Sequence, residues 1–140
     1  MKMNERLLLD TCAMIWLSQG APVSDAAMKA IGAVDTAKHP LRLSVMSAWE
    51  LGVLVAKGRL ASTKPPLRWF EEFVDVAGIQ VEEVTAGILI ASSYLPEPVH
   101  NDPMDRILIA TAREHDLTIV TRDRAILAYG EAGHVRTLAC

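Results

Sequence analysis

The stretch Arg6-Leu7-Leu8-Leu9-Asp10 decides the fold of this 140-residue chain. Three consecutive leucines that end at an acidic residue are typical of a short strand covered on both faces, as in a parallel sheet. A second apolar run, from Leu117 to Val120, is followed closely by Asp123. The two runs predict two central strands, each with an aspartate just beyond its carboxyl end.

Around these two runs, strand and helix patterns alternate along the chain. Strands are predicted at residues 6–10, 41–45, 79–83, 117–121 and 134–138. Helices are predicted at residues 13–18, 24–38, 46–57, 66–77, 85–95, 102–115 and 123–129. This alternation favours a three-layer α/β/α sandwich around a mostly parallel sheet of four or five strands. Polar and apolar residues alternate in 79–83, which predicts an edge strand.

The composition indicates one compact domain over residues 1–140. The chain is 51% hydrophobic and 22% charged, with a net charge of −3 and a pI near 5.8. This balance disfavours intrinsic disorder, and it disfavours a protein that binds nucleic acid through bulk positive charge. Two cysteines make no disulfide framework, and no apolar run reaches the roughly 20 residues of a membrane span. We therefore expect a cytoplasmic protein.

Four carboxylates fall at related positions in the predicted fold. Asp10 and Asp123 follow strands, and Glu50 and Asp105 lie in the first turns of helices. Strand carboxyl ends and helix amino ends meet at one edge of a parallel sheet, so all four acids should face one region. Asp10, Asp105 and Asp123 are equally well explained as helix caps. Glu50 is harder to explain that way, because a carboxylate inside an apolar helix is costly without a partner.

The four acids share one chemical explanation. Carboxylates gathered at one point repel one another, and a hard divalent cation removes that repulsion. Magnesium suits oxygen ligands and commonly bridges carboxylates to a phosphate, and manganese is a plausible substitute. Such a metal activates water and stabilises the oxyanion of a phosphodiester under attack.

Four segments of the chain carry these acids in series. They are Leu8-Leu9-Asp10-Thr11, Ser47-Ala48-Trp49-Glu50-Leu51, Asp102-Pro103-Met104-Asp105-Arg106-Ile107-Leu108-Ile109-Ala110 and Ile119-Val120-Thr121-Arg122-Asp123. In order and spacing they resemble the signatures of PIN-domain ribonucleases, and most closely those of VapC-type toxins from bacterial toxin–antitoxin pairs. The resemblance covers essentially the whole chain. It implies an α/β sandwich whose magnesium site is formed by Asp10, Glu50, Asp105 and Asp123.

The resemblance also implies roles for individual residues. Asp10 and Asp105 would hold the metal most directly, while Glu50 and Asp123 complete its shell or orient the attacking water. Thr121 matches a position that helps to order the site. Thr11 would bind within the site or cap the next helix, and Asp102 is favoured as a helix cap over a metal contact. Cys12 and Met104 depart from the usual residues without removing an acid.

Candidate RNA contacts lie close to the acids in sequence. They are Arg106, Arg122, Arg124, Lys57 and Arg59. Each of these cations is explained at least as well by solvated surface charge or an ion pair. For His100, a loop position without a catalytic role is favoured over contact with RNA or proton transfer.

The resemblance implies a metal-dependent endoribonuclease that inhibits translation or growth as a toxin. Its expected partners are RNA, an antitoxin that covers the acidic site, and a second copy in a homodimer, giving a heterotetramer or larger complex with antitoxin. The apolar residues 86–95 would bury within one subunit or form the dimer interface. Trp49 and Trp69 are predicted in the core, and Trp16 is a candidate for a partner surface.

Two other functions remain open. One is a catalytically silent PIN-like binding module, and the other is another magnesium-dependent phosphohydrolase. Phosphatases that form an aspartyl-phosphate typically carry a second aspartate two positions after the first, where this chain has Cys12. The chain also lacks a glycine-rich dinucleotide loop and a phosphate-binding loop.

Overall fold

The chain folds around a parallel sheet with the triple-leucine stretch at its centre. The structure is a computed structural model, and it describes residues 6–34, 38–97 and 101–140. Within these residues the sheet has five strands in the order β3 (Gln80–Glu82), β2 (Arg42–Ser44), β1 (Leu7–Leu9), β4 (Thr118–Thr121) and β5 (Arg136–Ala139). Every neighbouring pair is parallel. The predicted sheet is therefore confirmed, with the strand from 79–83 at an edge.

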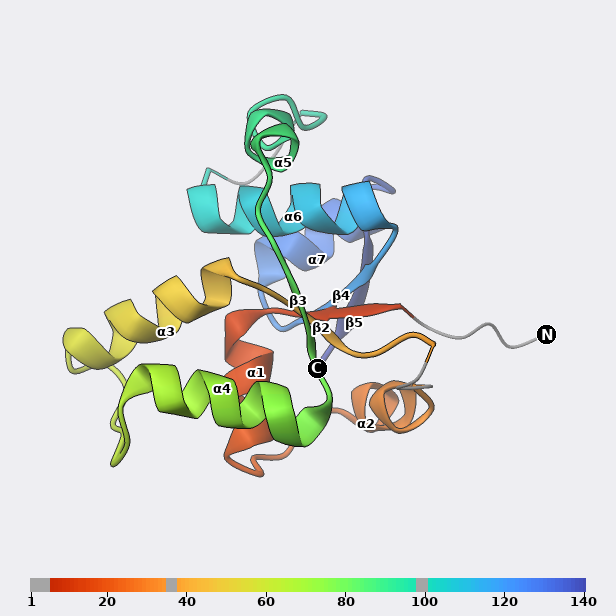
Figure 1. Cartoon of the computed structure of the whole chain (residues 1–140). Helices are drawn as coiled ribbons and strands as arrows, with labels where there is room; N and C mark the ends of the chain where they lie inside the picture. The colour runs from red at the N-terminus through yellow and green to blue at the C-terminus, as the bar shows by residue number, and fades with distance from the viewer. Residues whose placement is uncertain (1–5, 35–37, 98–100) are drawn as a thin grey trace.

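Helices cover both faces of the sheet, which gives the three predicted layers (Figure 1). One face carries α1 (Thr11–Ser18), α2 (Asp25–Gly32) and α4 (Pro66–Ala77), and the other carries α5 (Ala86–Ala91), α6 (Pro103–His115) and α7 (Arg124–Glu131). The remaining helix, α3 (Met46–Ala56), leaves the carboxyl end of β2 and packs along α4. No helix in the described ranges is long and apolar enough to cross a membrane.

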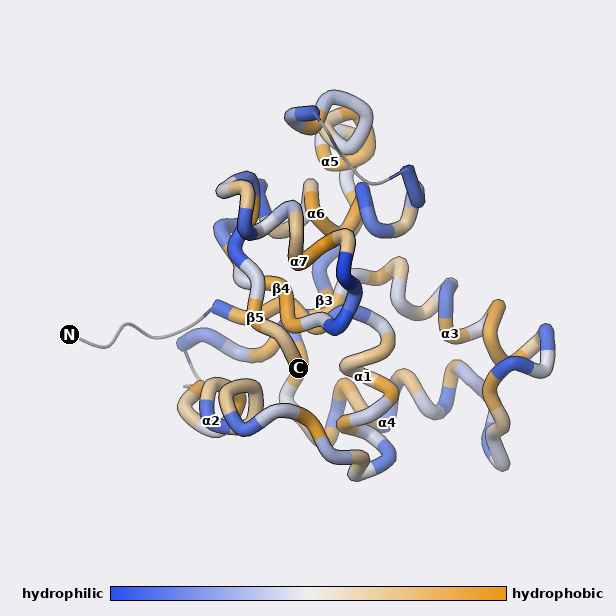
Figure 2. Tube along the Cα trace, turned by 180° about the vertical axis from the view of Figure 1, so that it is seen from behind, coloured by the Kyte–Doolittle hydropathy of each residue, from blue (hydrophilic) through white to orange (hydrophobic). Residues whose placement is uncertain are grey.

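Two hydrophobic cores lie on opposite faces of the sheet. Leu7 and Leu9 point into the core beneath α4, where they join Phe70. Leu8 points to the other face and joins Ile109 of α6. This alternation is what the pleat of a strand requires, and it explains why all three leucines are fully buried. Figure 2 shows the hydrophobic trace at β4 and over much of α5.

Two helices are shorter than the sequence predicts. The helix predicted at 24–38 is observed as α2 and ends at Gly32, and residues 35–37 lie outside the described part of the chain. The helix predicted at 85–95 is observed as α5 and ends at Ala91. There, the Ser92 hydroxyl donates to the Leu89 carbonyl over 2.6 Å. Such a local bond competes with the helical backbone pattern and favours an end to the helix.

Candidate active site

The carboxyl edge of the sheet brings Asp10 and Asp123 together. Asp10 directly follows β1 and caps α1, while Asp123 follows β4 by two residues and caps α7. The Asp10 backbone N–H donates to the Val120 carbonyl over 3.1 Å, so the ladder between the two strands continues to the first aspartate. The helix-cap explanation and the shared-edge explanation are thus both correct for these two acids.

One buried hydroxyl connects these two aspartates. Thr121 has no exposed surface, and its Oγ1 donates to Asp10 Oδ2 over 2.5 Å. The same oxygen accepts the backbone N–H of Asp123 over 3.0 Å. The other Asp10 oxygen, Oδ1, accepts from the Ala13 backbone N–H over 2.7 Å. The Asp10 carboxylate is therefore held in one orientation by contacts to both of its oxygens.

The electrostatics of Asp10 connect it to two of the other acids. Burial raises the pKa of the Asp10 carboxyl above its ordinary value, while the hydrogen bonds from Thr121 and Ala13 act in the opposite direction. The Glu50 and Asp123 carboxylates raise that pKa further. Like charges act this way only over short distances, so Glu50 and Asp123 lie within electrostatic reach of Asp10.

The fourth acid, Asp105, acts electrostatically on the Cys12 thiol. Partial burial, followed by the carboxylates of Asp10 and Glu50, raises the pKa of its thiol to about 11, although the residue keeps exposed surface. Smaller contributions come from the Cys140 thiol and the Asp105 carboxylate. Asp105 lies in the first turn of α6, behind the cap formed by Asp102. All four predicted acids therefore act electrostatically on the short segment from Asp10 to Cys12.

Glu50 is positioned through a bond between two helices. Thr11 Oγ1 and Ser47 Oγ lie 2.9 Å apart, both buried, and join α1 to the first turn of α3. Glu50 follows Ser47 by three residues and is half-buried, less enclosed than its apolar sequence neighbours indicate. Asp10 caps α1, so a capping role for Thr11 is wrong. Sequence reasoning missed Ser47, because its partner is 36 residues away.

The donor atoms at this edge suit a hard cation that keeps its water. Among the described residues, no three acidic, histidine or cysteine side chains lie close enough together to enclose a metal ion. Magnesium is commonly held through one or two carboxylates and retains several waters, so it does not need such an enclosure. Zinc, which takes three or four protein ligands directly, fits this edge poorly. The Glu50 and Asp123 carboxylates repel the charge on the largely buried Asp10, and a cation bound there would relieve that repulsion.

Two of the predicted RNA-contacting arginines make contacts within the protein. Arg122 stacks over the Trp16 ring at 3.8 Å and donates to the Pro22 carbonyl over 2.9 Å. Arg106 donates from Nε to the Ser92 carbonyl over 2.9 Å, which attaches α6 to the end of α5.

The other three cations are exposed. Arg124 begins α7, and Lys57 and Arg59 follow the end of α3. Lys57 is seven residues from Glu50, or roughly 10 Å along a helix. His100 lies outside the described residues.

Of the two tryptophans predicted in the core, one is buried and the other is exposed. Trp69 is buried as predicted, and its indole N–H donates to Ser18 Oγ over 2.9 Å. The prediction for Trp49 is wrong, because this side chain is 58% exposed. Ser47 and Leu51 form the buried side of α3. Trp49 lies two residues from each of them, about 200° around the helix, and so faces solvent. An almost entirely apolar helix gave no signal of which side would be covered.

A separate concavity lies away from the acids. A groove of about 1210 Å³ runs along β5 and is bordered by residues of α2, α6 and α7. None of the four acids lines it. The carboxyl edge remains the candidate site, because that is where titratable groups perturb one another.

Comparisons with known proteins agree with this geometry. A family model described as PIN domain matches residues 7–132. Ribonuclease VapC22 of Mycobacterium tuberculosis is 29% identical over 124 residues, which cover 88% of this chain and 91% of that protein.

Solved structures share the fold at low sequence identity. A crystal structure of VapBC2 from Rickettsia felis bound to a promoter DNA fragment matches with a TM-score of 0.69 and 14% identity, covering 95% of this chain and 97% of that one. A DNA-bound VapBC from Salmonella typhimurium matches with a TM-score of 0.66 and 16% identity, covering 96% and 98%.

Proposed function

This chain belongs to the PIN domain family, and from that premise we propose that it is a ribonuclease that hydrolyses RNA phosphodiester bonds with a divalent cation. The observation that carries the proposal is the Asp10 carboxylate, which is largely buried, fixed through both oxygens and within electrostatic reach of the Glu50 and Asp123 carboxylates. A buried carboxylate among like charges is costly for stability and is typical of a functional site. The similarity to Ribonuclease VapC22 supports RNA as the substrate.

The proposed division of labour follows from the resemblance to the family, and the local contacts support the part played by Asp10. Asp10 and Asp105 hold the cation, which we expect to be magnesium, with manganese as a substitute. Thr121 and Ala13 keep the Asp10 oxygens in place, so Asp10 meets its ligand without reorganisation. Glu50 and Asp123 complete the shell or orient the attacking water. When bound, the cation activates that water and stabilises the negative charge on the phosphate under attack.

The test replaces Asp10 with asparagine. Asp10→Asn keeps an N-cap acceptor for Ala13 and removes the charge, so the fold should persist while cleavage of RNA in magnesium is lost. Asp102→Asn is the matched control, since Asp102 is an exposed acid that caps α6 through contacts to Met104 and Asp105. We expect this control to keep wild-type activity. Full cleavage by Asp10→Asn, or equal loss in both variants, contradicts the assignment.

The same chain is proposed to act as the toxin of a toxin–antitoxin pair in the cytoplasm. Structural neighbours include VapBC complexes, which supports an antitoxin as partner. Expression alone should inhibit growth, and coexpression of a small protein encoded beside the gene should restore it. Asp10→Asn should leave growth unaffected. If Asp10→Asn inhibits growth as strongly as the wild type, inhibition does not come from cleavage.

A homodimer is also part of the proposal. Leu89, Ile90 and Tyr94 are exposed on and just after α5, which leaves an apolar surface there uncovered within one subunit. A second copy would cover it, and such a dimer would form a heterotetramer or larger complex with antitoxin. Light scattering should give the mass of a dimer for the wild type and of a monomer for Ile90→Glu. A monomeric wild type would refute this interface.

One observation favours the catalytically silent binding module. Among the described residues, no three potential metal ligands lie close together. A module that only sequesters a partner does not need such a group of ligands. A metal titration distinguishes the two functions. RNA cleavage that rises with magnesium concentration and depends on Asp10 refutes the silent module. Binding of a partner with no cleavage in magnesium or manganese refutes the ribonuclease.

A further inference from the structure

We propose that Trp49 is a stacking platform for an unpaired RNA base beside the acidic site. This inference rests on the proposed ribonuclease function and deepens it by naming how the site holds its substrate. Single-stranded RNA is commonly held by aromatic side chains that stack on splayed bases. Trp49 has the exposure, the position and the charge surroundings that such a role needs.

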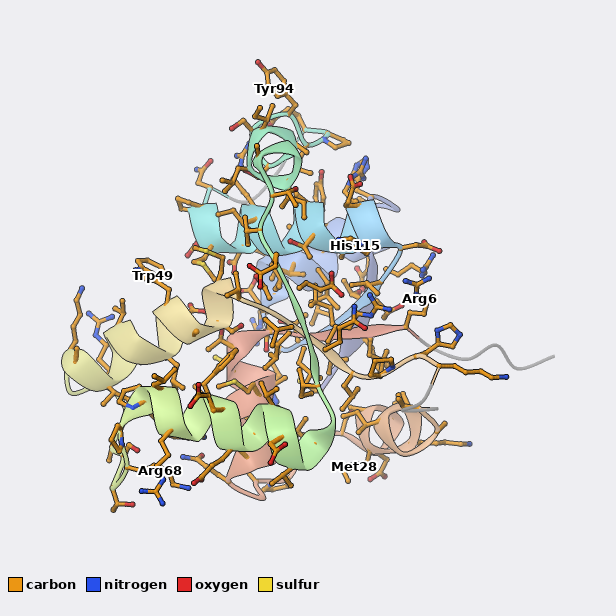
Figure 3. All side chains as sticks on the ribbon, viewed as in Figure 1. Arg6, Met28, Trp49, Arg68, Tyr94 and His115 are labelled. Carbon is orange, nitrogen blue, oxygen red and sulfur yellow. The ribbon has the colours of Figure 1, made fainter. Side chains whose placement is uncertain are left out.

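The exposure of Trp49 distinguishes it from the other two tryptophans. Trp69 is buried and its indole N–H is bonded to Ser18, and the ring of Trp16 lies against the Arg122 guanidinium. Trp49 is 58% exposed. In Figure 3 its side chain stands away from α3 into solvent, on the side of that helix turned toward α6 in this view. A large aromatic ring in water is available to a ligand that offers another flat surface.

The position of Trp49 ties it to the acids. It directly precedes Glu50, so the two Cα atoms are about 3.8 Å apart. Glu50 is one of the carboxylates that act on both Asp10 and Cys12. The Thr11–Ser47 bond fixes this first part of α3 against α1. Trp49 therefore stands on a fixed helix turn at the border of the candidate site.

The negative charge of the molecule favours stacking as a source of affinity for RNA. The chain carries a net charge of −3, and the candidate site adds four acids to the region that a polyanion must approach. Two of the three arginines directly next to these acids in sequence, Arg122 and Arg106, make contacts to protein carbonyls. Stacking on an aromatic ring does not depend on net charge, so it supplies affinity that this surface does not obtain from cations alone.

The test measures binding separately from cleavage. A fluorescently labelled single-stranded oligoribonucleotide is titrated with the Asp10→Asn protein, and anisotropy gives Kd. Adding Trp49→Ala should weaken binding roughly 5- to 100-fold, the range expected for loss of one stacked base, whereas Trp49→Phe should stay within a few-fold. Met28→Ala is the matched control. Met28 is a large hydrophobic on α2, 53% exposed, well away from Trp49 in Figure 3, and its removal should leave Kd unchanged.

Two further readouts keep the outcome unambiguous. In the otherwise wild-type protein, Trp49→Ala should raise KM for a single-stranded substrate by a similar factor and leave the melting temperature unchanged. Equal RNA binding by the proteins with Trp49 and with Trp49→Ala overturns the inference while leaving the ribonuclease intact. A change of oligomer mass in light scattering on Trp49→Ala also overturns it, because the ring would then serve a protein interface. If the wild type cleaves no RNA in magnesium, the proposed function fails first.

Discussion

Replacing Thr121 with valine removes a single oxygen atom from a side chain with no exposed surface. That oxygen donates to Asp10 Oδ2 and accepts the Asp123 backbone N–H, so both bonds are lost while side-chain volume is nearly kept. A bond to a charged group contributes about 1.5–3 kcal/mol, and a buried amide left without an acceptor costs about 1 kcal/mol or more. We expect Thr121→Val to lower the free energy of unfolding by about 3 kcal/mol.

Thermal and urea denaturation in the presence of a chelator measure this loss. For a domain of this length, about 3 kcal/mol corresponds to a fall in melting temperature of roughly 10 °C. Thr111→Val is the matched control, because Thr111 is equally buried but donates only to the Ile107 carbonyl within its own helix. That control should stay within about 1 kcal/mol of the wild type. If the two variants unfold alike, the Thr121 hydroxyl does not stabilise the site.

The same variant has a predicted pH signature. The bond from Thr121 lowers the Asp10 pKa against the effects of burial, Glu50 and Asp123, so removing it raises that pKa further. A cleavage rate that needs the ionised Asp10 carboxylate is present above this pKa and is lost as the pH falls through it. The acidic limb of the profile should therefore move to higher pH in Thr121→Val. An unmoved limb, or one at lower pH, would show that Asp10 ionisation does not limit the rate.

Three smaller predictions concern packing, an ion pair and a thiol. Gly130→Ala should lower stability by about 1–3 kcal/mol in urea denaturation, because its Cβ would lie 2.5 Å from Thr137 Oγ1, and Thr137→Ala should restore most of the loss. Arg42→Met should cost about 3 kcal/mol by the same assay, since it removes the guanidinium held 2.7 Å from the buried Glu82 carboxylate, and apolar replacement of both residues should cost less. Alkylation of Cys12 at pH 8 should run roughly 100-fold slower than alkylation of a thiol with the ordinary pKa of 9.0, because the pKa of Cys12 is about 11. Magnesium should accelerate the alkylation of Cys12 by neutralising the nearby acids. Alkylation rates that do not respond to magnesium would place the cation elsewhere.

The parts of the fold that could be predicted are those with local signals. The runs around Leu8 and Ile119 identified the central strands, and the aspartates after them pointed to one edge, because parallel strands end together. The exposure of Trp49 could not be predicted, since α3 is apolar on most sides and its covered side depends on packing with α4. The stacking of Arg122 on Trp16 joins residues more than a hundred positions apart, which no local pattern encodes.

The two explanations that the sequence left open for its aspartates turn out to be one arrangement. Asp10 and Asp123 each use Oδ1 to cap a helix, through Ala13 and Ile126, and in Asp10 the second oxygen meets Thr121. The cap fixes the carboxylate, and the amino end of the helix favours its negative charge. Asparagine caps as well as aspartate, so Asp→Asn variants keep the helix cap while they remove the charge. Alanine would remove both, at about 1 kcal/mol for the cap, and a loss of activity in it would not distinguish a missing ligand from a loosened helix.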